Sequence, residues 1–236
     1  MATSEVPSKA RKMIREFVML VVGVLVALSA DSWWADRQTQ ADVDELLRVL
    51  VAELEENRAE LVDEQTTRSD MLDANRTLLR LINEEMSLPA NDSLTGLVFS
   101  TIYWSDPLLS FGAYEVLVSR GTADRVDPNL LARLAAHVSA SRIGIPYDRG
   151  VQAQAAGRIT ELIGEHGGFL SITSSQFRSS RALPAPRDDP DFQSLLDDPD
   201  FANAAAVIYV LHYNYLEWLE RRLTEVEGFL SELREG

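Results

Sequence analysis

Apolar residues recur at alternating spacings of four and three along residues 37–86, the heptad pattern of a coiled coil or of a long bundle helix. Neither glycine nor proline interrupts residues 35–88. At ~1.5 Å per residue a helix over 37–86 would be about 75 Å long, far longer than is usual in a globular domain. The positions of this N-terminal seam are Val43, Leu47, Leu50, Leu54, Asn57, Leu61, Glu64, Arg68, Met71, Asn75, Leu78 and Ile82.

The middle of the N-terminal seam is polar, because Asn57, Glu64, Arg68 and Asn75 occupy seam positions. Polar residues at such positions can fix the register or the oligomeric state of a coiled coil at a cost in stability. Alternatively, the helix rotates at this point and packs with another face. The rotation is the interpretation that we favour from the sequence.

A second long pattern runs from about Asp200 to Glu235 and defines a C-terminal seam. A further apolar stripe widens its N-terminal half, which we expect to be buried on more than one side. His212 lies on this seam, and a hydrogen-bonded core histidine is favoured over a pH-sensing role. The seam consists of Ala205, Tyr209, His212, Leu216, Leu219, Leu223, Val226, Leu230 and Leu233, and the stripe of Ile208, Leu211, Tyr215 and Trp218.

Turn signals divide the region between the two long patterns into shorter helices. Residues 87–96 predict a turn, residues 94–104 a short apolar helix, and the Asp106-Pro107 pair a break. The next helix is expected to end at Gly121, in the position of a C-terminal cap. These signals place a chain of short elements between two long ones.

A longer helix is expected to start at Asp127-Pro128, with the aspartate as N-cap and the proline at the first helical position. Gly144 and Pro146 predict an interruption before the pattern resumes over 151–165, and the Ser/Pro-rich residues 171–190 predict an internal loop. No segment shows a convincing strand pattern. The sequence therefore predicts an all-α fold: an N-terminal transmembrane helix that continues into a long stalk helix, and an antiparallel helical bundle.

The transmembrane prediction rests on fourteen uncharged residues from Phe17 to Ala30. They cover about 21 Å, less than the ~30 Å of a bilayer core. The flanks supply the rest, because Trp33 and Trp34 suit one headgroup layer while Lys12 and Arg15 can reach back to the other.

Three interpretations of this stretch compete. A soluble core helix would be unusual so close to a terminus and behind a basic cluster. A cleaved signal peptide fits the basic and apolar order, although Leu28 is a poor residue three positions before a cut after Ala30. An uncleaved anchor is favoured, because the helical pattern continues past Trp34 without a turn signal. The positive-inside rule then makes residues 1–16 a cytoplasmic tail, 17–35 the membrane helix and 36–236 an extracytoplasmic bundle.

Net charge and composition restrict the classes of partner and of site that the protein can have. The net charge is −15, and the first 30 residues hold four of the 22 basic residues but only two of the 37 acidic ones. The remaining body is therefore strongly acidic, which argues against nucleic-acid binding. The chain has no cysteine, so disulfides, thiolate metal sites and cysteine nucleophiles are excluded.

Sequence motifs give no sign of catalysis. The histidines, His137, His166 and His212, have no convincing metal-ligand spacing, and nucleophile elbows, phosphate loops and dinucleotide fingerprints are missing. We expect no enzyme activity and no cofactor. Within the apolar stretch, Gly23, Ala27 and Asp31 recur every four residues, which favours either close packing of a second helix or an ordinary lipid-facing composition.

Two segments resemble a bacterial family of uncharacterised single-pass membrane proteins. In "VVGVLVALSADSWWADR", Gly23, Leu25, Ala27, Leu28 and Trp34 match the family's Gly-aliphatic-Leu-aliphatic-Ala-Leu run and tryptophan. In "AYEVLVSRG", Ala113, Tyr114, Glu115, Leu117, Ser119 and Gly121 match its Ala-Tyr-Glu-x-Leu-x-Ser-x-Gly segment. The similarity covers roughly residues 17–135 and implies an uncleaved anchor and a helical body. The family tends to have amides where this chain has Asp31 and Ser32, so amide contacts are not implied.

We interpret the second segment, residues 113–121, chiefly as a packing element. We expect Tyr114, Leu117 and Val118 on one helical face, with a positive-φ exit at the glycine that follows. A ligand site formed by Tyr114, Glu115, Ser119 and Arg120 is the alternative.

The expected function is that of a membrane-anchored interaction protein in the bacterial inner membrane. It would bind the lipid bilayer and either a protein partner, as an accessory subunit of a complex, or itself, as a scaffold. A periplasmic bundle that senses a ligand and acts through a partner is the alternative.

Overall fold

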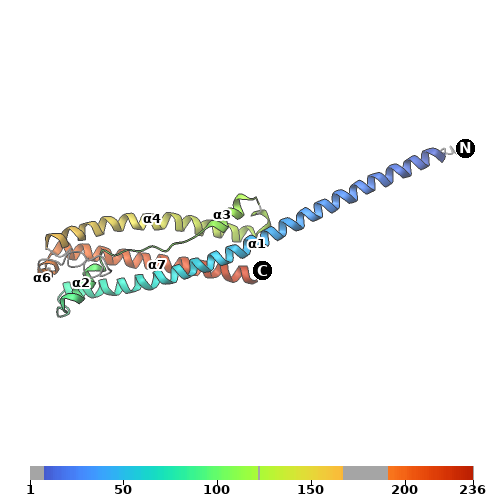
Figure 1. The fold of residues 1–236 in the computed structure, drawn as a ribbon. Helices are drawn as coiled ribbons and strands as arrows, with labels where there is room; N and C mark the ends of the chain where they lie inside the picture. Colours follow the sequence, from blue (N-terminus) through green and yellow to red (C-terminus); the bar gives the residue numbers. More distant parts are fainter. Residues whose placement is uncertain (1–7, 122, 167–190, 236) are drawn as a thin grey trace, which may run out of the picture. The chain divides into compact units, whose positions relative to one another are not determined.

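The computed structural model describes residues 8–121, 123–166 and 191–235, and these residues form helices and connecting segments without a strand (Figure 1). The prediction of an all-α fold is confirmed. The expected loop at 171–190 and the first seven residues of the expected tail lie outside the described residues.

The first helix, α1, runs without a break from Ser8 to Ile82. It contains both the apolar stretch and the N-terminal seam, as the sequence predicts. Every position of that seam is buried or half-buried. The four polar positions are among the buried ones: Asn57, Glu64, Arg68 and Asn75 expose between 0 and 5% of their surface. The favoured interpretation of a rotating helix is therefore wrong, because the polar face itself is packed.

The chain divides into two compact units, and α1 contributes to both. The first consists of Met1–Leu50 and Gly112–Pro128, the second of Val51–Phe111 and Asn129–Gly236. In the first unit, α1 is joined by α3 (Gly112–Ser119) and the short 3₁₀ helix η1 (Ala123–Arg125). Its buried hydrophobic side chains come from α1, from α3 and from the residue after η1: Val43, Leu50, Ala113, Leu117 and Val126.

The α3 segment confirms one expectation and corrects another. Gly121 has φ +67°, a conformation that glycine adopts without steric cost, so the predicted positive-φ exit is present. Val118, expected on the packed face, is exposed. An eight-residue helix that touches its neighbours along one stripe buries Ala113 and Leu117, four residues apart, and turns Val118 away.

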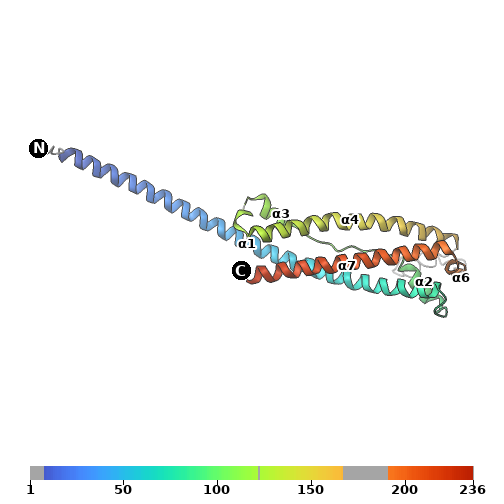
Figure 2. The ribbon, with the colours of Figure 1, turned by 180° about the vertical axis from the view of Figure 1, so that it is seen from behind.

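The second unit is built on three long helices: the C-terminal part of α1, α4 (Pro128–Glu165) and α7 (Pro199–Glu235). Ion pairs join Arg58 to Glu227 and Arg234 to Glu55, so α7 runs antiparallel to α1. The pairs Arg133–Glu232 and Arg158–Asp200 make α7 antiparallel to α4 as well. It follows that α1 and α4 run in the same direction, as both ribbon views show (Figures 1 and 2).

A hydrophobic core closes one end of this unit, where α2 (Asn91–Phe99) and α6 (Phe192–Leu196) pack with the long helices. Most of the C-terminal seam and its stripe are buried, as expected for a helix in contact on more than one side. The core includes Leu78, Leu81, Leu94, Val98, Ile159, Leu162, Ile163, Phe192, Leu195, Leu196, Phe201, Ala205 and Ile208.

The helix predicted over 94–104 is shorter and starts earlier. It begins at Asn91, inside the expected turn, and ends at Phe99. The Ser100 and Thr101 hydroxyls donate to the carbonyls of Leu97 and Val98 at 2.5 and 2.7 Å. Such local side-chain bonds compete with helical ones and favour an end at this point. Residues 103–111 then follow without regular secondary structure.

The interruption predicted at Gly144 and Pro146 is wrong, because α4 is continuous from Pro128 to Glu165. The glycine serves close packing instead. A Cβ built at Gly144 would lie 2.9 Å from the indole Nε1 of Trp218 on α7. The absence of a side chain at this position therefore lets the indole lie directly against the α4 backbone.

We expect Gly144→Ala to leave the protein less stable than Gly157→Ala by about 1–3 kcal/mol, the usual cost of overpacking a filled site. Both glycines lie within α4, so both changes gain the same helix propensity. A Cβ at Gly157 would meet nothing within 4 Å. Equal stability of the two variants in urea unfolding would show that the Trp218 contact is not tight.

Candidate functional site

The apolar stretch of α1 is uncovered by the rest of the described chain. α1 is long and apolar enough to cross a membrane, and its most apolar window has no buried residue. Phe17, Leu20, Leu25 and Leu28 each expose more than half of their surface. Exposed apolar patches of this kind mark contact with a membrane or with another protein.

The small-residue stripe is equally accessible. A Cβ at Gly23 would meet nothing within 4 Å, and Ala27 and Asp31 are exposed. The expected interfacial residues Arg15, Trp33 and Trp34 are exposed as well, whereas the side chain of Lys12 lies outside the described ones. Both interpretations of the stripe therefore stay predictions, because no described segment of the chain fills it.

The segment around Tyr114 packs against the rest of its unit, and its polar side chains do not converge on a common site. Tyr114 is half-buried, while Glu115, Ser119 and Arg120 are exposed. The Ser119 hydroxyl donates to the Val116 carbonyl at 3.1 Å, a bond within its own helix. Contact with the rest of the unit runs through the buried Ala113 and Leu117. The arrangement favours the packing interpretation over the ligand site.

The most concentrated chemistry of the second unit surrounds Arg68, which has no exposed surface. Its Nη2 donates to Glu64 Oε1 at 2.5 Å and to the Ser105 carbonyl at 2.8 Å, and its Nη1 lies 2.8 Å from Nδ1 of His212. The guanidinium also lies 3.8 Å from the ring centre of Trp104 and 4.8 Å from that of Tyr215. A buried charge of this kind requires several partners, and both terminal nitrogens of the guanidinium have them, whereas the buried Nε has none among the described residues.

The cluster continues to the surface through Asp106. This carboxylate accepts from the Trp104 indole at 2.9 Å and from the Tyr215 hydroxyl at 3.4 Å. It also pairs with Arg149 of α4, whose side chain is exposed. The aromatic rings and Asp106 thus connect α1, residues 103–111 (the extended segment), α4 and α7 in one polar network.

The buried polar positions of α1 have a clear physical role. Residues 103–111 lack regular structure, and their backbone groups need partners when packed against a helix. Asn57 supplies two bonds: its Nδ2 donates to the Ser110 carbonyl at 2.7 Å, and its Oδ1 accepts from the Ser110 N–H at 2.8 Å. Glu64 accepts from the Ser105 hydroxyl at 2.6 Å. The polar seam therefore holds the extended segment in register.

His212 is neutral in this network. Burial and the neighbouring Arg68 guanidinium lower its pKa to about 3. Because arginine only donates, Nδ1 of His212 accepts and its proton sits on Nε2. Burial also lowers the pKa of Arg68, against the opposing effect of Glu64. The expected buried, hydrogen-bonded histidine is present on the C-terminal seam.

This state of His212 makes stability depend on pH. The unfolded histidine has a pKa near 6.5 and the folded one about 3, so the unfolded state binds more protons between these values. We expect the free energy of unfolding to fall as pH drops from 6.5 towards 3, by at most about 1.4 kcal/mol per pH unit for one group. Urea unfolding of His212→Asn should show a shallower slope than the parent; an unchanged slope would contradict this assignment. Because burial lowers the pKa of His137 as well, part of the slope should remain.

A second buried histidine lies between α4 and α7. His137 Nδ1 is 2.8 Å from Oε2 of Glu225, and Arg222 pairs with Oε1 of the same carboxylate at 2.8 Å. The ring of Phe229 meets the imidazole edge-on at 5.6 Å. These residues line a cleft of about 440 Å³ together with Arg133, Ala136, Ala140, Thr224 and Gly228.

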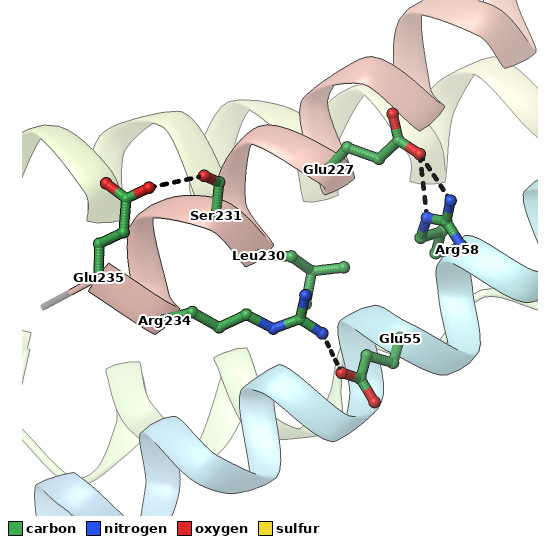
Figure 3. A pocket seen from close by; sticks show the side chains of 7 residues that line it. All are labelled: Glu55, Arg58, Glu227, Leu230, Ser231, Arg234 and Glu235. Carbon is green, nitrogen blue, oxygen red and sulfur yellow. Dashed lines mark hydrogen bonds and ion pairs between the residues drawn. The ribbon is translucent and has the colours of Figure 1, made fainter.

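A larger groove of about 750 Å³ lies between α1 and α7, and Figure 3 shows that charged side chains bridge it. Arg58 of α1 points to Glu227, and Arg234 of α7 points to Glu55. Exposed pairs of this kind contribute little stability each but mark which faces meet. Among the described residues, no group of three histidine, aspartate or glutamate side chains is placed to hold a metal ion.

Sequence reasoning identified Arg68 and His212 as seam positions but not as partners. It missed Trp104, because residues 94–104 were predicted to be helical, and it assigned no partner to Asp106 or Arg149. A polar run within a strict heptad seam was the available signal. Such a run predicts that another segment of the chain supplies hydrogen-bond partners, but only the fold identifies that segment.

Comparisons of the chain with protein-family models, with curated proteins and with solved structures found no match. The resemblance of the two segments to single-pass membrane proteins therefore stays a prediction.

Proposed function

We propose that the protein is a single-pass inner-membrane protein whose helical bundle serves in protein interaction. The observation that carries this proposal is the uncovered apolar stretch of α1. About 25 cal/mol is lost for each Å² of apolar surface left in water, so an exposed stretch of this length needs a cover. A bilayer supplies it, with Trp33 and Trp34 at one interface.

The proposed orientation places the N-terminus in the cytoplasm and the bundle in the periplasm. Support comes from Lys9, Arg11, Lys12 and Arg15, which precede the apolar stretch and favour the cytoplasmic side. The acidic body that follows has no comparable basic cluster. Translocation of a long domain depends little on its own acidic residues.

The proposed interaction role rests on the contacts that the buried polar side chains of the second unit make. The buried charges of the second unit bind one another and the extended segment, which favours a rigid structural body over a reaction centre. The stripe of Gly23, Ala27 and Asp31 offers a surface that a second membrane helix can approach closely. The partner is either a foreign subunit, which makes the protein an accessory component, or a second copy, which makes it a scaffold.

The direct test is purification of the tagged full chain from its native membranes in mild detergent, with the subunits and the mass read by mass spectrometry. Gly23→Leu with Ala27→Leu should remove the bound subunit or the second copy. Val21→Leu with Leu25→Ile, on the opposite face of the same helix, is the matched control and should retain it. A monomer without foreign subunits in the parent protein would overturn the interaction role.

Ligand sensing is the second candidate, and the cleft beside His137 favours it. Its apolar floor, formed by Phe229, Ala136 and Ala140, and the charged Arg222 and Glu225 resemble the lining of small-molecule sites in general. A ligand specific to this cleft should raise the unfolding temperature of the parent protein. The same ligand should have no effect on the Ala140→Leu variant, in which the cleft is filled.

A further inference from the structure

The segment that follows α3 is tied to α1 at the end of the apolar stretch. Arg125 Nη2 donates to Asp36 Oδ1 at 2.5 Å. Asp36 lies two residues beyond Trp34, so it is only ~3 Å further along the helix axis. Both partners belong to the first unit. If Trp34 marks the bilayer interface, Arg125 lies at the depth of the lipid headgroups.

Two side chains that precede Arg125 by a few residues in the same segment are exposed. Val118 exposes 45% of its surface, and Arg120 is exposed without an ion pair to any described residue. The guanidinium of Arg37 lies over the ring of Trp33, 5.3 Å from its centre, which leaves its outward donors available. Gly121, with its positive φ, turns the chain directly after Arg120.

This combination fits the headgroup layer of a membrane. A guanidinium binds phosphate through paired N–H donors, and Arg125 has donors left beyond the one used by Asp36. The surrounding body is acidic and by itself repels an anionic surface. Arg120 and Arg125 therefore have to provide the attraction, while Val118 supplies apolar contact of the kind that residues at an interface make.

We propose that Val118, Arg120 and Arg125 form a lipid contact, in which the two arginines bind the phosphates of membrane lipid headgroups. The contact is a second attachment of the first unit to the membrane, beside the helix that spans it. It deepens the proposed function and rests on it, because Arg125 reaches the headgroups only if the apolar stretch of α1 crosses the bilayer. The occupant is the lipid surface itself, since Arg125 is tied to Asp36, two residues beyond the interfacial Trp34.

The absence of cysteine allows a direct test with single-cysteine variants of the full chain. Val22→Cys, Val49→Cys and Val118→Cys carry an environment-sensitive fluorophore in vesicles of anionic phospholipid. One set of vesicles has a nitroxide quencher on the headgroup, the other a quencher in the middle of the acyl chain. Val49 is the matched control, because it is exposed on α1 thirteen residues beyond Asp36, or ~20 Å along the axis.

We expect the acyl-chain quencher to act on position 22 and the headgroup quencher to act on position 118 far more than on position 49. Arg120→Glu in the Val118→Cys background should weaken docking at least roughly fivefold, the effect of removing one cationic contact near an anionic surface. Arg120→Lys should retain most of it. Uncharged lipid or high salt should weaken quenching at position 118 without any change in the protein.

The two proposals fail in different ways. Quenching at position 22 together with equal, low quenching at positions 118 and 49 would leave the membrane span standing and overturn the lipid contact. No quenching at position 22 would overturn the span and the lipid contact with it. Quenching at position 118 that does not change with Arg120→Glu, with salt or with lipid charge would contradict binding through phosphates.

Discussion

Replacing Arg68 with alanine is expected to lower the free energy of unfolding by about 3–5 kcal/mol, the usual cost of removing one partner of a buried ion pair. The change leaves the Glu64 carboxylate buried without its cation. It also removes the donors to the Ser105 carbonyl and to His212. Urea unfolding of the full chain in mild detergent, followed by far-ultraviolet dichroism, measures the effect.

The matched control is Arg76→Ala, one heptad and one residue further along α1. Arg76 lies on the surface, where it interacts with Tyr209 of α7 and pairs with Asp73, so its loss should cost less than about 1 kcal/mol. Glu64→Ala combined with Arg68→Ala should cost less than the sum of the single changes, since residues in contact couple by about 0.5–3 kcal/mol. Additive costs, or a small effect of Arg68→Ala alone, would contradict the buried network.

The second large effect is expected in the apolar stretch. Val22→Arg together with Leu25→Arg should prevent membrane insertion, because each arginine near the centre of a membrane helix costs about 2.5–3.5 kcal/mol. Fractionation of cells should then find the protein outside the membrane fraction. Both valine and leucine are exposed, so the change cannot act by disrupting a packed core.

Val49→Arg is the control for this pair. Val49 is also an exposed hydrophobic residue of α1, but it lies outside the apolar stretch. The variant should remain in the membrane fraction and fold normally. If the double-arginine variant stays membrane-bound as well, the apolar stretch is not the anchor.

Periodicity was a reliable guide where one helix packs along its whole length. The N-terminal seam was placed residue by residue, and the C-terminal helix was predicted within a residue or two of Pro199 and Glu235. Glycine and proline, which often interrupt helices, were a poorer guide to where helices end. Gly144 and Pro146 predicted an interruption, but α4 continues because the glycine accommodates Trp218 and the surrounding contacts outweigh local preference.

The two candidate sites, the apolar stretch and the Arg68 cluster, also differ in how far the sequence predicts them. The apolar stretch was identified from composition alone, and in the part of the chain that the structure describes no other helix is long and apolar enough to cross a membrane. The contact of Arg68 with His212 spans more than 140 residues, and no local pattern encodes such a contact. The polar run at Asn57, Glu64 and Arg68 was visible, but its partner was not, because the extended segment carries no periodicity of its own.

The most direct test of the account is labelling of two single cysteines by a membrane-impermeant maleimide in spheroplasts. Met13→Cys and Ile143→Cys suit it, because both positions are exposed in the structure, one before the apolar stretch and one in α4. We expect position 143 to be labelled in intact spheroplasts and position 13 only after the membrane is permeabilised. Labelling of both positions from outside, or of position 13 alone, would contradict a single-pass protein with a cytoplasmic N-terminus.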